Sequence, residues 1–293
     1  MREFSWMLLV LLAFWAGCQD QPKVQEPSTV EQKSEPVSAQ LPEEEVVVGS
    51  AEELRRITAK KIIWKTDGSE MVLVRSYTPT QYEEKKTFDR LGNPITKKVK
   101  VSDSLPVLWV DVTEVTVGQF KKFLSQTDHQ FDGDLWSSVE TYSPTDKHPM
   151  INVSWNDAMA YTKWAGKRLP MDREWGFAAK GSLVGKKFSW GEDDRVARDY
   201  ANYAGIGGKD KWEESTAPVG SFKPNGYGLY DMAGNVWEWC QDWYTSDKFF
   251  RVLRGGSWNL NATNLRVARR YFHAPHGRLN YFGFRCVSGF DKP

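Results

Sequence analysis

The stretch HPMINVSWNDAMAYTKWAGKRLPMDREWGFAAKG, residues 148–181, contains the plainest helix signals in the chain and anchors the prediction of its fold. Ser154 has the side chain of an N-cap, and Gly166 followed by Pro170 ends the helix that it opens. The apolar residues at helical spacing between these signals are Ala158, Tyr161, Trp164 and Ala165. DREWGFAAKG, residues 172–181, predicts a second short helix.

Sequence patterns on either side of this stretch predict an α+β fold with much loop. Upstream, VLWVDVTEVT (residues 107–116) alternates with period two, and VGQFKKFLSQT then changes to helical spacing, with Phe120, Phe123 and Leu124 on one face. Downstream of Lys187 there is almost no helix signal, and the expected strands are RVLRGGSW (residues 251–258) and YFGFRCV (residues 281–287). Few helices and many short strands are therefore expected.

The composition limits the classes of partner. The length of 293 residues suits one large domain or two small ones. A net charge of +1 gives no basic excess of the kind that nucleic-acid binding requires, so no nucleic-acid partner is expected. Aromatic residues make up 14% of the chain, including 14 Trp, which predicts a dense core, a stacking surface, or both.

The first residues have the layout of a bacterial lipoprotein signal peptide. Arg2 precedes an apolar run over residues 4–14, which is too short to span a bilayer, and Ala16 and Gly17 lead into Cys18. This arrangement resembles a lipobox, although Trp15 stands where Leu is usual. It implies cleavage, lipidation of Cys18 and a partner in outer-membrane lipid, in a cell-envelope protein. An ordinary cleaved signal peptide or a buried cysteine is the alternative.

Residues 19–60 are rich in Gln, Pro, Glu and Ser, and predict a disordered tether between residues 1–18 and a folded domain over residues 61–293. A short helix over AEELRRITAKK is expected to close the tether. In an oxidising envelope the two other cysteines, Cys240 and Cys286, are a possible disulfide. The alternative is two buried thiols that behave as small apolar side chains.

Five motifs in order resemble the formylglycine-generating enzyme (sulfatase-modifying factor) family. They are VTEVTVGQFKKFL, the opening stretch of residues 148–181, TAPVGSFKPNGYGLYDMAGNVWEWCQDWY, RVLRGGSW and GFRCV, and the resemblance covers residues 70–287. It implies a single, loop-rich domain related to the C-type lectin fold and held together by aromatic packing.

Active members of that family oxidise a sulfatase cysteine to formylglycine with two cysteines after the GGS motif, and aerobic members bind copper there. Gapless alignment places Leu260 and Leu265 at those positions. A leucine has no thiolate to bind copper or to attack a disulfide, so neither copper nor the family's oxidase chemistry is expected.

The resemblance also implies a structural calcium site. Its matching residues are Asp231, Gly234, Val236 and Glu238. Asp231 and Glu238 would supply carboxylate oxygens and the other two backbone carbonyls, which suits the several oxygen ligands that calcium prefers. The alternative is that the two acids only cap a turn.

The stretch after the glycine pair is predicted to form a polar binding wall. The candidate ligand-binding residues are Ser257, Trp258, Asn259, Asn261, Asn264 and Arg266. In strand geometry alternate residues share a face, and asparagine and arginine donors suit a glycan or a peptide. The alternative is that the tryptophan belongs to the core and the arginine is merely exposed or paired.

Three functional classes follow. The favoured one is a non-catalytic envelope lipoprotein whose lectin-like cleft binds a peptide, a glycan or a partner protein. The second is a sulfatase-modifying oxidase, or another modifying enzyme, with a non-standard site. The third is a scaffold with no small ligand.

Overall fold

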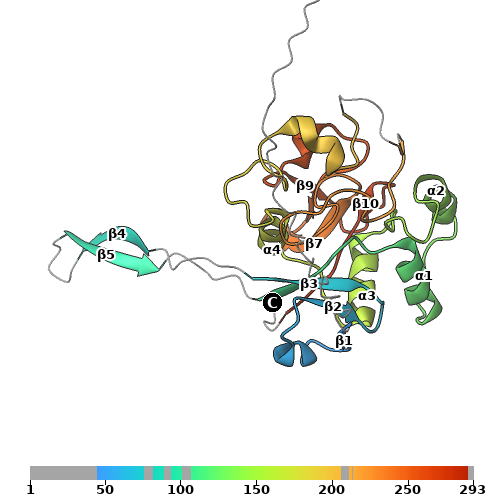
Figure 1. Ribbon diagram of the computed structural model, residues 1–293, viewed down its shortest axis with the longest axis horizontal. Helices are drawn as coiled ribbons and strands as arrows, with labels where there is room; N and C mark the ends of the chain where they lie inside the picture. The colour runs from blue at the N-terminus through green and yellow to red at the C-terminus, as the bar shows by residue number, and fades with distance from the viewer. Residues whose placement is uncertain are drawn as a thin grey trace, which may run out of the picture. The chain divides into compact units, whose positions relative to one another are not determined.

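The computed structural model describes residues 45–75, 82–88, 94–100, 107–205, 211–212 and 214–289 (Figure 1). Its strands are β1 (Val47–Val48), β2 (Lys61–Trp64), β3 (Glu70–Val74), β4 (Tyr82–Phe88), β5 (Pro94–Lys100), β6 (Leu108–Asp111), β7 (Trp237–Trp243), β8 (Arg251–Arg254), β9 (Arg270–His273), β10 (Phe282–Gly283) and β11 (Val287–Gly289). Its α-helices are α1 (Val117–Ser125), α2 (Leu135–Tyr142), α3 (Trp155–Ala165) and α4 (Asp172–Ala179), and its 3-10 helices are η1 (Glu53–Arg56), η2 (Asp194–Asp199) and η3 (Ala262–Leu265). The α+β class with short strands and few helices is as predicted.

The first sheet has the strand order β1-β2-β3-β6-β11. Strand β6 pairs antiparallel with both β3 and β11, so that Val110 lies opposite Val72 on one side and Val287 on the other. All four residues of β6 are buried. The C-terminal strand of the domain is therefore held beside a strand that lies far upstream in the chain.

The second sheet has the order β10-β7-β8-β9, and the strand predicted over residues 281–287 is divided between the two sheets. Its first part, β10, pairs parallel with β7, whereas Val287 belongs to β11 in the first sheet. Arg285 lies between these strands and is completely buried. The prediction of a single strand over residues 281–287 was wrong, because the residues between β10 and β11 cross from one sheet to the other.

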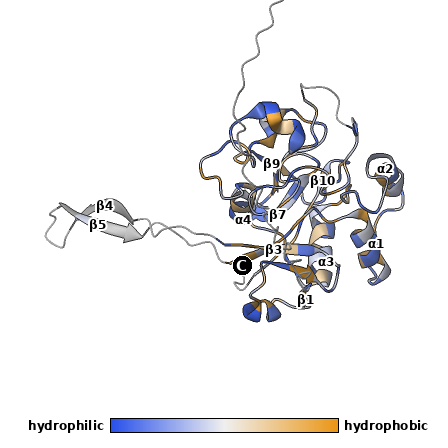
Figure 2. Cartoon of the chain, in the orientation of Figure 1, coloured by the Kyte–Doolittle hydropathy of each residue, from blue (hydrophilic) through white to orange (hydrophobic). Residues whose placement is uncertain are grey.

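The two helices of the opening stretch form where they were predicted. The Ser154 hydroxyl accepts a hydrogen bond from the backbone N–H of Asp157, and Gly166 ends α3 in the left-handed region with φ of 72°. Figure 2 shows both hydrophobic and hydrophilic residues along α1 and α3, as expected for helices that bury one face. Helix α2 was not predicted; Asp134 at its N-cap makes no side-chain capping bond, and Val139 is its only buried residue.

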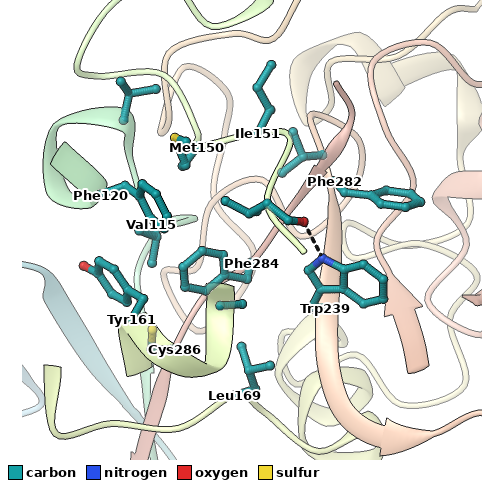
Figure 3. Packing of buried hydrophobic residues seen from close by; sticks show 14 of the residues in the cluster. Val115, Phe120, Met150, Ile151, Tyr161, Leu169, Trp239, Phe282, Phe284 and Cys286 are labelled. Carbon is teal, nitrogen blue, oxygen red and sulfur yellow. Dashed lines mark hydrogen bonds between the residues drawn. The ribbon is translucent and has the colours of Figure 1, made fainter. Parts of the chain in front are cut away.

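The core is built on large aromatic side chains. Trp64, Trp109, Trp175, Trp237 and Trp239 are among the largest fully buried side chains. In Figure 3 the Trp239 indole N–H donates to the Val153 carbonyl over 2.9 Å, and Tyr161 lies beside Phe284 with ring centroids 5.3 Å apart. This packing confirms the prediction of an aromatic core.

The folded domain begins earlier than the predicted boundary at residue 61. Val48 in β1 is fully buried opposite Trp64 of β2, and Leu54 in η1 is also buried. The residues from 45 to 60 are therefore part of the fold, because the apolar run Val46–Val48 supplies an additional strand. The predicted signal peptide, Cys18 and the tether up to residue 44 lie outside the described residues. In the described ranges, none of the helices has the length and apolarity needed to cross a bilayer.

Candidate functional site

A glycine pair turns the chain sharply where β8 ends. Gly255 and Gly256 have φ values of 100° and 84°, in the left-handed region that favours glycine. A Cβ at Gly256 would lie 2.9 Å from the Asn264 carbonyl oxygen. The glycines thereby let the chain fold closely over the following residues, which include all the candidate ligand-binding residues.

Ser257 and Trp258 are mainly structural. Ser257 is fully buried and its hydroxyl donates to the Asn259 side-chain carbonyl over 2.8 Å. Trp258 is 8% exposed, stacks on Tyr142 with ring centroids 5.6 Å apart, and donates to the Asn280 carbonyl. Trp258 is therefore held in place by Tyr142 and Asn280, and the exposed Asn259 follows it in the chain.

The strand geometry expected for residues 259–264 is wrong. The Asn261 side chain caps η3 by accepting from the backbone N–H of Thr263, and it also accepts from the Asn264 amide. Local side-chain bonding to the backbone competes with strand pairing and favours the turn. Asn264 thus donates to Asn261, and Asn259, Asn261 and Arg266 are all exposed.

The two leucines that the resemblance aligns with the family's cysteines pack into different parts of the core. Leu265 is 1% exposed, in a cluster with Phe188 and Tyr203. Leu260 is partly buried and packs against the larger cluster that contains Trp237. Both side chains contribute hydrophobic contacts.

The predicted calcium ligands fit a metal only in part. Both carboxylate oxygens of Glu238 are bound by Arg285, over 2.8 Å each, and one of them also accepts from the Trp175 indole over 2.7 Å. Within the described ranges, no group of three His, Cys, Asp or Glu residues is arranged to hold a metal ion. Glu238 is therefore the ion-pair partner of Arg285 in this structure, and its role as a calcium ligand stays a prediction.

Asp231 still offers a free carboxylate oxygen to a metal ion, and the structure places Glu114 beside it. One oxygen of Asp231 and both oxygens of Glu114 are buried without a hydrogen-bond partner. Burial, followed by the nearby charge of Asp231, raises the pKa of Glu114 well above its usual value, and burial also raises the pKa of Asp231. Sequence reasoning missed Glu114, although an acidic residue within the alternating apolar stretch 107–116 was a signal.

The possible disulfide is not formed, since Cys240 and Cys286 are both free and fully buried. They belong to different core clusters, which is why the disulfide considered from the sequence does not form. Burial raises the pKa of each thiol well above its usual value.

We expect neither thiol to react with a thiol reagent in the native domain, because each is shielded and protonated. After denaturation without reductant, a chain of residues 44–293 is expected to titrate as two thiols. If no thiol is titrated, Cys240 and Cys286 are joined by a disulfide.

A buried lysine cluster also escaped the sequence analysis. The Lys167 ammonium donates to Asp67 and Asp111 over 2.8 Å each, and the Tyr161 hydroxyl donates to Asp67 over 2.9 Å. The side chains of Lys167 and Asp67 have no exposed surface. The cluster ties α3 to the first sheet, and its saturated bonding indicates a structural role.

The Sulfatase-modifying factor enzyme 1-like domain matches residues 65–289. A formylglycine-generating enzyme of Streptomyces coelicolor is 38% identical over 168 residues, covering 49% of this chain and 54% of the relative. A Bos taurus protein named inactive C-alpha-formylglycine-generating enzyme 2 is 43% identical over 155 residues, covering 50% of this chain and 52% of the relative. The matches thus span about half the length of these relatives.

Solved structures share the fold. PvdO from Pseudomonas aeruginosa is similar with a TM-score of 0.60 at 24% identity, over 80% of this chain and 100% of PvdO. CarF is similar with a TM-score of 0.56 at 23% identity, over 75% of this chain and 98% of CarF. With a family match over most of its described residues and a fold of the same kind, the chain belongs to the sulfatase-modifying factor family.

Proposed function

We propose that this protein is a non-catalytic member of its family, anchored in the cell envelope, that binds a peptide, a glycan or a partner protein. The observation that carries the proposal is the packing of Leu260 and Leu265 into two separate core clusters. Leucine side chains offer no nucleophile, no redox chemistry and no soft metal ligand at positions that the resemblance aligns with the family's cysteines. The bovine relative named as inactive supports the same reading.

The proposed binding surface is centred on Asn259. Asn259 is exposed next to the stacked Trp258 in the sequence, and exposed Arg266 follows on the same segment. A rigid aromatic base with an amide and a guanidinium beside it suits a polar ligand that carries carboxylate or hydroxyl groups. The lipid on Cys18 would hold this domain at the outer membrane.

We further propose that calcium stabilises the fold by neutralising Asp231 and Glu114. Three of their carboxylate oxygens are buried without a partner, and calcium favours such oxygen ligands. Its proposed role is structural and does not include a reaction step.

We expect the chain of residues 44–293, which holds all four core clusters, to produce no formylglycine above a no-protein control. The domain is incubated with copper and a sulfatase-motif peptide, and loss of the peptide cysteine is followed by mass spectrometry. The Streptomyces coelicolor enzyme in the same buffer serves as the positive control.

Conversion above background would favour the second candidate, an oxidase with a non-standard site. The 38% identity to a protein named formylglycine-generating enzyme is the observation that keeps this candidate in view. Near-UV circular dichroism of the same sample confirms folding, so that a negative result reports on chemistry.

A further inference from the structure

A short loop after α4 presents two aliphatic side chains to solvent. Val184 is 86% exposed, the highest value among the large apolar side chains in the described ranges, and neighbouring Leu183 is 36% exposed. The loop is a defined turn: the Leu183 N–H donates to the Lys180 carbonyl over 2.8 Å, and Gly181 and Gly185 have φ values of 54° and 74°. The backbone therefore holds the apolar tip in a fixed position.

Cationic side chains flank this tip on both sides. Lys180 precedes it and Lys186 and Lys187 follow it. The backbone N–H of Val267 donates to the Lys187 carbonyl over 2.9 Å, which brings the Arg266–Arg269 turn alongside the loop. We define the cationic loop surface as Lys180, Leu183, Val184, Lys186, Lys187, Arg266 and Arg269.

The charges of this surface are largely unopposed. Four of its cations, those of Lys180, Lys186, Arg266 and Arg269, make no ion pair with any residue that the structure describes. Among the described residues, the Glu192 carboxylate accepts the Lys187 backbone N–H, and Asp172 pairs with Arg254 and Arg270 beside the Arg266–Arg269 turn. A chain with a net charge of only +1 thus concentrates positive charge around an exposed apolar tip.

We propose that the cationic loop surface contacts an anionic lipid bilayer. A bilayer interface offers phosphate groups for the lysines and arginines and, just below them, an apolar boundary for the Val184–Leu183 tip. Long lysine stems also extend past an inserted tip while their ammonium groups stay at the phosphates. An acidic protein would match the charges but would not account for a protruding aliphatic pair.

This contact involves neither Cys18 nor Asn259 and shares only Arg266 with the Asn259 surface, so it extends the proposed function without depending on it. It would orient the domain against the membrane to which the lipid tethers it. Variants of Lys180, Val184 and Lys186 keep Arg266, so loss of lipid binding by these variants would leave the proposed ligand binding unaffected.

The test is co-sedimentation of residues 44–293, which lack Cys18 and the apolar run, with vesicles. One set is phosphatidylcholine alone and the other is phosphatidylcholine mixed with phosphatidylglycerol. We expect binding only to the anionic set, reversed by high salt. Lys180→Gln and Lys186→Gln should each weaken binding about fivefold, and Val184→Ser should weaken it to a similar extent, about fivefold.

Matched variants elsewhere on the surface serve as controls. Val47→Ser replaces another exposed valine, and Lys147→Gln removes another exposed lysine, and neither should change binding. Equal binding to neutral and anionic vesicles, or full binding by the loop variants, would overturn the proposal. So would retention on an immobilised polyanion without vesicle binding, which would assign the surface to an acidic macromolecule.

Discussion

Replacement of Arg285 by methionine is expected to destabilise the domain by about 3–5 kcal/mol, a large part of the total stability of a typical domain. Arg285 is fully buried between the two sheets, binds both oxygens of Glu238, and donates to the Tyr230 carbonyl over 2.9 Å. Without its charge, the carboxylates of Glu238, Glu114 and Asp231 would be buried together with no cation. Burial acts to lower the pKa of Arg285, but these three carboxylates outweigh it and the net shift is upward.

The measurement is urea unfolding of residues 44–293 followed by tryptophan fluorescence. Arg195→Met is the matched control, since Arg195 forms an exposed pair with Asp193, and it should cause no measurable loss. If Arg285→Met does not fold, the double variant Arg285→Met/Glu238→Gln provides the test, because it removes both charges and should recover part of the stability. A single variant as stable as the unsubstituted domain would contradict the assigned role of the ion pair.

Calcium is expected to stabilise the domain by about 2.7 kcal/mol at a concentration of 100 times its dissociation constant, and the effect should grow as pH rises. The pKa values of Glu114 and Asp231 are both raised on folding, mainly by burial. The folded state therefore binds their protons more tightly than the unfolded state does. Their contribution to stability is full below the unfolded pKa values, 3.8 for aspartate and 4.5 for glutamate, and is lost as pH rises through the raised folded values. A bound cation would offset this loss.

Thermal unfolding in EDTA and in calcium, across acidic to alkaline pH, checks this expectation. In EDTA the melting temperature should fall as pH rises, and in calcium the fall should be reduced. Glu114→Gln should remove much of both effects and be about 1–3 kcal/mol more stable in alkaline EDTA, because a neutral amide replaces a buried charge. Asp146→Asn, at an exposed ion pair, is the control that should leave both responses intact. Identical curves with calcium and with EDTA would rule out the proposed site.

The two stability predictions concern residues whose juxtaposition the sequence did not reveal. Glu114, the Asp231–Glu238 motif and Arg285 come from three separate segments. The family resemblance pointed to Asp231 and Glu238 as calcium ligands, but it gave no indication that Arg285 would occupy both oxygens of Glu238. That pairing depends on the passage of residues 284–286 between two sheets.

The sequence alone determined the features that arise within a few residues of one another. Ser154 and Gly166 define the ends of α3 because caps act through the nearest backbone groups. The family motifs and the aromatic composition similarly indicated an α+β domain with a tryptophan-rich core. Tertiary structure alone decided that Leu260 and Leu265 enter different clusters, that Cys240 and Cys286 stay apart, and that Lys187 meets Val267. These outcomes depend on how distant strands and loops pack, and short-range sequence patterns do not contain that information.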